Sequence, residues 1–369
     1  MGLFPITPIE GLRGKAIRPM LTPHVCRAGY DGLAAHAFYD QLCDGLMTDP
    51  VLFAVSIDGD ASGAPLAGTE IGRLLKDDQL AWAHLDANNP ATKAWLKKEI
   101  TYLDELVIKA LLAEETRPRI LRLGDGILLI LRGVNLNENA SPEDMVSIRL
   151  WVDPHRIVSL QKRRLRAVGD IADRLTKGAG PDNSGSFVAM LINLLFARMA
   201  PVVTSLGEEM DDIEESMIDG RPDMLREQIV SIRKKAIIFR RYMAPQRDLI
   251  KALVDGDIDW IDVVTIRRLI EAQDDITRFI EELDSIRERA QIVNDEIGNM
   301  LTERLNGNMY ALSVVAAIFL PLGFLTGLLG INIAGIPGAD NPWAFLIFCG
   351  LLAGLVAAQI IIFKKKGWF

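Results

Sequence analysis

Two long apolar runs near the end of the chain form its strongest pattern. Neither Tyr310–Leu329 nor Ala344–Phe363 contains Asp, Glu, Lys, Arg or His. Each has the ~20 residues that an α-helix needs to cross the ~30 Å hydrocarbon core of a bilayer. The pattern predicts two transmembrane helices, residues 309–329 and 344–363, joined by a loop of residues 330–343 outside the cell.

A regular apolar seam precedes the first run. Its members recur every seven residues in two registers: Ile276, Leu283, Ala290 and Ile297, and Phe279, Ile286, Val293 and Met300. Such a seam predicts a long helix that packs along partner helices. We expect one helix from about Ile258 to Leu329, of which residues 258–308 form a stalk in a parallel oligomer.

Short apolar or alternating runs that end at turn residues predict strands in the first part of the chain. The expected strands are Val51–Ile57, Leu80–Asp86, Ile127–Leu131, Ser147–Val152 and Arg156–Leu160. Helical spacing occurs in Ala91–Glu114, Phe187–Asp219 and Pro222–Val254. We therefore expect residues 1–257 to form a cytoplasmic α/β domain, an α/β/α sandwich with a long helical pair.

Charge orients the two predicted spans. Three lysines, Lys364 to Lys366, follow the second run directly, whereas the 330–343 loop has no basic residue and one acid, Asp340. Because cytoplasmic flanks carry the excess of Lys and Arg, residues 364–369 are expected to form a cytoplasmic tail. Two spans return both termini to the cytoplasmic side of the inner membrane.

The chain as a whole is acidic, with a formal net charge of −8. Residues 309–369 hold three Lys and a single Asp, so the acidic excess belongs to the part before the spans. An acidic body argues against nucleic acid as a partner and is compatible with handling cations. The cysteines Cys26, Cys43 and Cys349 lie far apart and form no CxxC pair, which is typical of a reducing compartment.

One face of the first predicted span carries small or flexible residues. At intervals of three or four lie Asn306, Met309, Leu312 or Ser313, Ala316, Leu320, Gly323 and Gly327. The second span has no comparable stripe. A face of this kind, with Asn306 at one end and Asn332 at the other, predicts the wall of an ion conduit in which polar rings flank an apolar constriction.

Enzyme motifs are absent from the sequence, which has no P-loop, GxSxG or HExxH. We expect neither an enzymatic activity nor an enzymatic cofactor. His24, His36, His84 and His155 are scattered without partners at metal-ligand spacing, so a structural role is the better interpretation, with His84 the hardest to dismiss as a ligand. A non-transporting membrane sensor is the competing hypothesis, although a sensor would not need the pore-facing stripe.

These features together resemble the CorA superfamily of divalent-cation transporters, most specifically in residues 306–369. Within it the chain is similar to the ZntB zinc-transport branch. That similarity rests on Gly330–Asn332 followed by Gly335–Gly338, on Asn341–Phe345 and on Glu114–Arg119. The family signature is Gly-Met-Asn after an aromatic residue, and here Leu329 and Ile331 stand at the aromatic and Met positions.

The resemblance implies a homopentamer whose first span lines a central pore. Gly330, Ile331 and Asn332 would form the ion filter, and Asp340 a ring of negative charge at the outer mouth. The implied function is uptake of divalent cations, zinc first, driven by membrane potential or a proton gradient, with a magnesium, cobalt or nickel channel as the alternative. Asn332 by itself is also typical of a helix C-terminus.

Acidic residues on the stalk permit two interpretations. Glu271, Asp274 and Asp275 are either a solvated helix face or a regulatory site that binds a divalent cation between subunits. Carboxylates facing one another across an interface repel until a cation neutralises them, which would couple cation binding to closure.

Overall fold

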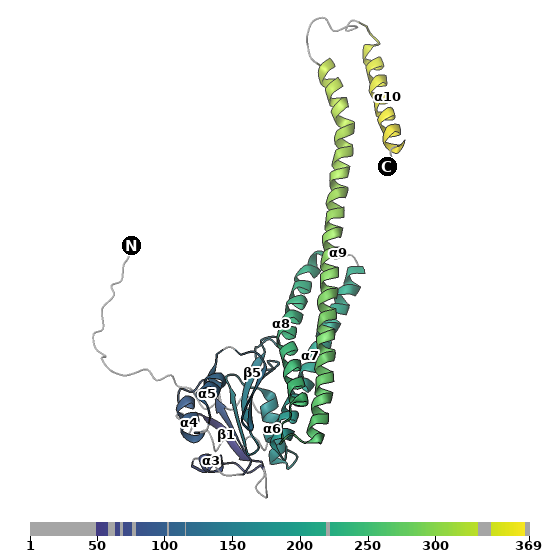
Figure 1. Ribbon diagram of the computed structural model, residues 1–369. Helices are drawn as coiled ribbons and strands as arrows, with labels where there is room; N and C mark the ends of the chain where they lie inside the picture. Colours follow the sequence, from purple (N-terminus) through teal and green to yellow (C-terminus); the bar gives the residue numbers. More distant parts are fainter. Residues whose placement is uncertain are drawn as a thin grey trace, which may run out of the picture. The chain divides into compact units, whose positions relative to one another are not determined.

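The computed structural model describes residues 49–57, 63–66, 69–75, 79–101, 103–114, 116–218, 222–330 and 341–365. They fall into two compact units (Figure 1). The sheet unit contains the described residues up to Ser205 together with Ile237–Asp284, and the helical unit contains Leu206–Ala236 and the residues from Ser285 onward.

A six-stranded mixed sheet forms the centre of the sheet unit. Its strands are β1 (Val51–Ser56), β2 (Ala81–Asp86), β3 (Arg119–Leu123), β4 (Gly126–Gly133), β5 (Val146–Val152) and β6 (Arg156–Gln161). They lie in the order β1-β2-β6-β5-β4-β3, and only the β2–β6 pairing is parallel. The five expected strands are confirmed. The edge strand β3 was missed because its side chains are mostly exposed and two of its five residues are arginines.

Three helices cover one face of this sheet: α3 (Thr69–Leu74), α4 (Thr92–Glu99) and α5 (Glu105–Leu112). The core on this side joins Ala83 and Leu85 of β2, Val158 and Leu160 of β6, Leu96 of α4 and Leu111 of α5. The helical spacing over Ala91–Glu114 is confirmed, and the structure divides it into two helices, α4 and α5. The Asp104 carboxylate accepts a hydrogen bond from the Leu106 backbone N–H at 2.7 Å and starts a second helix there.

The opposite face is covered by α6 (Arg166–Thr176) and the first part of α7 (Ser184–Ile218) (Figure 1). The Phe187 ring lies edge-on against Trp82 of β2, with 4.8 Å between ring centroids. A Cβ on Gly133 of β4 would come within 2.7 Å of the Leu195 side chain, so α7 sits directly on the sheet. Helices on both faces confirm the α/β/α sandwich.

Long helices continue the chain: α7, α8 (Pro222–Asp255) and α9 (Val263–Leu329). The expected helices over 187–219 and 222–254 are confirmed. The helix expected from about Ile258 starts at Val263. Asp262 precedes it and accepts a hydrogen bond from the Thr265 N–H at 2.7 Å, which fixes the N-terminus.

The heptad seam of α9 is buried against helices of the same chain. In the sheet unit, Phe279 lies edge-on to Phe196 of α7, with centroids 6.4 Å apart, and Asp284 pairs with Arg240 of α8 at 2.6 Å. In the helical unit, Arg289 bonds Glu214 of α7 at 2.8 and 2.6 Å. The prediction of a buried seam is confirmed. Helices α7 and α8 supply partner surfaces for the seam within the chain, and the stalk in a parallel oligomer stays a prediction.

Among the described residues, three helices are long and apolar enough to cross a membrane: α7, α9 and α10 (Ala344–Lys365). In α7, half of the 18-residue stretch with the highest hydropathy is buried inside the protein. The buried share of the corresponding stretch is 6% in α9 and 0% in α10. The sheet and α9 therefore cover part of the apolar surface of α7. The apolar surfaces of α9 and α10 are left for lipid or for other copies of the chain to cover.

Candidate ion pathway

The end of α9 has a covered side and an open side. Val314 is buried, and Ala317, Ile318, Pro321 and Leu325 are half-buried. These positions fall on one side of the helix, and the Ala317 carbonyl accepts a hydrogen bond from Gln359 of α10. This is therefore the side that α10 covers.

The stripe predicted to line a conduit lies on the open side. All of its members are exposed: Asn306, Met309, Leu312, Ser313, Ala316, Leu320, Gly323 and Gly327. A Cβ added at Gly323 or Gly327 would meet nothing within 4 Å, so no contact within the chain requires a glycine at either position. Small residues that the single chain does not need are typical of a close approach by another helix.

Two hydroxyl groups of this span, those of Ser313 and Thr326, are satisfied inside α9. Ser313 donates to the Met309 carbonyl at 2.8 Å, and Thr326 donates to the Leu322 carbonyl at 2.9 Å. In hydrocarbon an unpaired polar group is strongly unfavourable, and bonds to the preceding helical turn remove that penalty. The two hydroxyls are therefore compatible with a membrane-spanning helix.

The predicted filter lies at the boundary of the described chain. Gly330 closes α9, and its N–H donates to the Thr326 carbonyl at 2.9 Å. Ile331, Asn332 and Asp340 lie outside the described residues. The chain resumes at Asn341, whose side chain accepts a hydrogen bond from the Trp343 N–H at 2.9 Å and so begins α10.

The candidate regulatory acids all lie on α9 within the sheet unit. Glu271 and Asp274 are exposed, and Asp275 pairs with Arg278 at 2.7 Å. Within the described ranges, no group of three or more His, Cys, Asp or Glu side chains could hold a metal ion. A regulatory site between subunits stays a prediction.

Residues 77–365 match the family described as CorA-like Mg2+ transporter protein. The chain belongs to this family. Among similar proteins, "Divalent cation transporter CmaX" of Pseudomonas aeruginosa is 36% identical over 86% of this chain and 96% of its own length. "Zinc transport protein ZntB" of Pectobacterium carotovorum is 35% identical over 85% of this chain and 95% of its own length.

The fold agrees with this assignment to the CorA-like family. The structure of full-length CmaX superimposes with a TM-score of 0.74 at 35% identity, covering 86% of this chain and 98% of that one. The chain is therefore a CorA-like membrane transporter of divalent cations and not an enzyme. The sheet domain, the long helix and the apolar C-terminal helices are those of the family.

The stretch Glu114–Arg119 of this CorA-like chain borders the sheet, where two arginines hold it. Arg132 of β4 donates to the Thr116 carbonyl at 2.8 and 3.1 Å. Arg149 of β5 is fully buried and donates to the Ala113 carbonyl at 2.7 Å. Burial lowers the pKa of the Arg149 guanidinium, and the charge of Arg132 adds to that effect. These contacts are structural ones.

His84 is also structural. It is buried in β2, its Nδ1 lies 2.7 Å from the Ser159 hydroxyl, and Trp82 Nε1 donates to that same hydroxyl at 2.7 Å. Burial lowers the pKa of His84 to about 4, although the side chain of Gln161 opposes the shift. The ring is therefore neutral at physiological pH. His24 and His36 lie outside the described residues.

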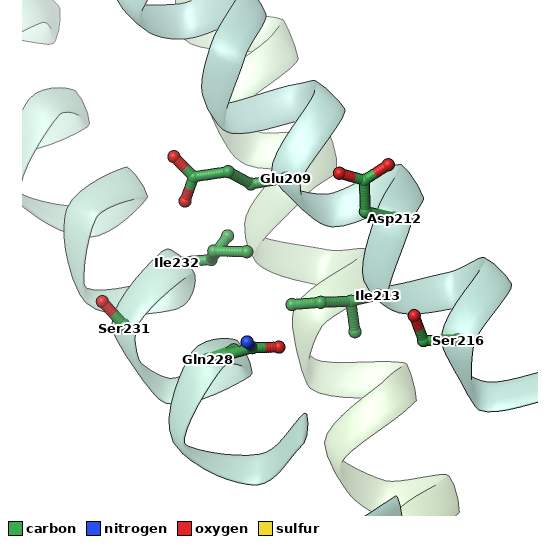
Figure 2. Close-up of a pocket in the computed structure, with 7 residues that line it drawn as sticks. All are labelled: Glu209, Asp212, Ile213, Ser216, Gln228, Ser231 and Ile232. Carbon is green, nitrogen blue, oxygen red and sulfur yellow. The ribbon is translucent and has the colours of Figure 1, made fainter. Parts of the chain in front are cut away.

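Sequence reasoning did not find two open cavities, because each joins residues far apart in the chain. One of 440 Å³ in the sheet unit includes Asp153 and His155, but Asp153 already accepts bonds from Trp151 Nε1, the His155 N–H and Arg156 Nε. The other, of 360 Å³, lies between α7 and α8 in the helical unit (Figure 2). Its Glu209 carboxylate is paired with Lys235 at 2.9 Å.

Proposed function

We propose that this CorA-like protein takes up divalent metal cations, zinc first, through a pore at the centre of a homopentamer in the inner membrane. The observation that carries the proposal is the open face of α9. It is lined by small, flexible and amide residues that no contact within the chain requires. The ZntB and CmaX relatives, by name a zinc and a divalent-cation transporter, support the substrate class.

Oligomerisation follows from the physics of the membrane. A polar path in hydrocarbon must be enclosed by protein, and two helices cannot enclose one. Several copies of α9, each with its open face toward a common axis, can do so. The number five comes from the family resemblance, and the need for partners comes from the exposed face itself.

The proposed topology has α9 and α10 as the two spans and both termini in the cytoplasm. Lys364 and Lys365 end α10 and Lys366 is the next residue in the sequence, whereas the 330–343 loop has no basic residue. Helix α7 is not counted as a span, because half of its apolar stretch is buried inside the protein, where Phe187 packs on the sheet and Phe196 on α9.

The proposed filter is a ring of Asn332 side chains with carbonyls at Gly330, and Ile331 between them. Asp340 would concentrate cations at the outer mouth. Neutral oxygen ligands hold a hydrated ion through its water shell, and magnesium dehydrates reluctantly. Such a ring discriminates poorly between zinc and magnesium. We choose zinc as the first candidate ion because of the similarity to ZntB, and magnesium as the second because of the description of the family.

The driving force in this proposal is the membrane potential, which is worth ~2.3 kcal/mol per charge per 100 mV and favours cation entry. A proton gradient is the alternative source of energy. The two proposed spans contain no Asp, Glu or His to carry protons, so proton coupling rests on the family resemblance alone.

Zinc uptake by cells that express Asn332→Ala tests the proposal. We expect uptake to fall to the level of cells without the protein, while the oligomer keeps its mass in mild detergent. Asn299→Ala is the matched control, since it makes the same chemical change at an exposed position of α9 outside the filter. Normal uptake by the Asn332 variant would overturn the filter, and wild-type uptake equal to that of empty cells would overturn the function.

A further inference from the structure

Pro321 interrupts the backbone hydrogen bonds of α9 within the proposed first span. Proline has no backbone N–H, so the carbonyl of Ala317, four residues earlier, has no donor within the helix. A proline ring also clashes with the carbonyl four residues earlier, which favours a bend in the helix. In hydrocarbon no water replaces the missing donor, so the open carbonyl must find another partner.

Gln359 of α10 supplies that partner. Its side-chain Nε2 donates to the Ala317 carbonyl oxygen at 3.1 Å. The Ser313 and Thr326 hydroxyls on this part of α9 are already engaged, because Ser313 donates to the Met309 carbonyl and Thr326 to the Leu322 carbonyl. Gln359 is also the only amide or charged side chain in residues 344–363.

Burying the Gln359 carboxamide in this position costs free energy, because one of its two polar atoms is left without a hydrogen bond. Its Oε1 is buried and has no hydrogen-bond partner among the described residues. The reverse orientation would set that oxygen against the Ala317 oxygen, so the contact itself fixes which end faces α9. An apolar side chain would avoid the penalty. The bond to the carbonyl is therefore the stabilising contribution that an amide makes here.

The bond lies beside the proposed pore wall. Ala317 and Pro321 are on the side that α10 covers, and their neighbours Ala316 and Leu320 are on the open face. A change of bend at Pro321 would therefore move Leu320 across the path. We propose that Gln359 is a positioning residue, which holds the bend of α9 through the Ala317 carbonyl and thereby sets the pore width near Leu320. This inference rests on the proposed function.

A double-mutant cycle in proteoliposomes separates this role from simple packing. Gln359→Leu removes the donor, and Pro321→Ala restores a backbone N–H that can reach the Ala317 carbonyl. We expect Gln359→Leu to lower divalent flux about three- to tenfold when residue 321 is Pro, and to change it little in the Pro321→Ala background. Ile361→Leu, at an exposed position of α10, is the control and should leave flux unchanged. An equal loss in both backgrounds, or no loss in either, overturns the positioning role.

A second readout does not depend on transport. A 13C label placed at the Ala317 carbonyl by semisynthesis reports its hydrogen bond by infrared spectroscopy in lipid. Gln359→Leu should move the labelled band to higher wavenumber, and Pro321→Ala combined with Gln359→Leu should move it back. An unmoved band in Gln359→Leu refutes the bond. If wild-type protein carries no divalent cation, the proposed function fails, while this measurement still tests the contact.

Discussion

The buried side chain of His84 makes the stability of the sheet unit depend on pH. The ring packs between strands, 5.0 Å from the Phe53 ring by centroid, and stays neutral because burial disfavours its charged form. Its folded pKa of about 4 lies below the ordinary value of 6.5. The unfolded chain therefore binds the proton first as pH falls.

The contribution of His84 to stability is complete above about pH 6.5 and is lost progressively as pH falls toward about 4. One pKa unit corresponds to ~1.4 kcal/mol, so the loss reaches about 3 kcal/mol. We expect His84→Phe to remove this part of the pH dependence. Urea unfolding of the full-length protein in detergent, followed by tryptophan fluorescence between pH 7 and pH 4.5, measures it. An unchanged slope in the variant contradicts the assignment.

At the scale of elements, α9 is held in two different ways. Its first part buries an apolar seam against α7 and α8, and among the described residues α10 covers one side of its last turns. Arg289 joins the first set of contacts, since it bonds Glu214 and pairs with Asp211 on α7. Both carboxylates raise the pKa of Arg289, so it is charged at every accessible pH.

We expect Arg289→Met to lower the stability of the helical unit by about 1 kcal/mol, because a partly exposed ion pair contributes no more than that. The effect should shrink in high salt, which screens the pair. Thermal unfolding followed by circular dichroism at two ionic strengths provides the test. Arg267→Met, on an exposed position of the same helix, serves as the control. Equal shifts for both variants would show that the contact with α7 contributes nothing.

The acids at the start of α9 carry the proposal for regulation. If Glu271, Asp274 and Asp275 bind a cation between subunits, internal divalent cation should slow flux in the wild type. Replacing all three by their amides should abolish that inhibition, since neutral side chains do not repel and need no cation. Flux assayed at increasing internal magnesium decides the matter. Unchanged inhibition in the triple variant removes these residues from the mechanism.

The sequence predicted what depends on local pattern and missed what depends on packing. Apolar periodicity located five strands, the long helices and the open face of α9. It did not predict β3, an exposed edge strand, or the break at Asp104, where one side chain decides between one helix and two. The bond from Gln359 to Ala317 was also out of reach, because it depends on how α10 packs beside α9. The heptad pattern indicated that the seam of α9 is buried, but not whether helices of the same chain or of another copy bury it.

For the whole molecule, the proposed topology predicts labelling from opposite sides of the membrane. In a variant without Cys26, Cys43 and Cys349, a cysteine placed at Ala339 should react with a membrane-impermeant reagent added to intact cells. One placed at Gly367 should react only after the membrane is opened. Labelling of both from outside would show that α10 does not cross the membrane and would contradict the proposed topology.

The central claim is that the assembled protein conducts divalent cations. Purified protein in liposomes that hold a divalent-sensitive dye tests it most directly, with zinc, magnesium, cobalt and nickel added in parallel under an inside-negative potential. The account predicts entry of zinc that speeds up as the potential becomes more negative, and loss of that entry in Asn332→Ala. Entry of magnesium without zinc would contradict the choice of ion. No entry of any of the four ions above protein-free liposomes would contradict the account itself.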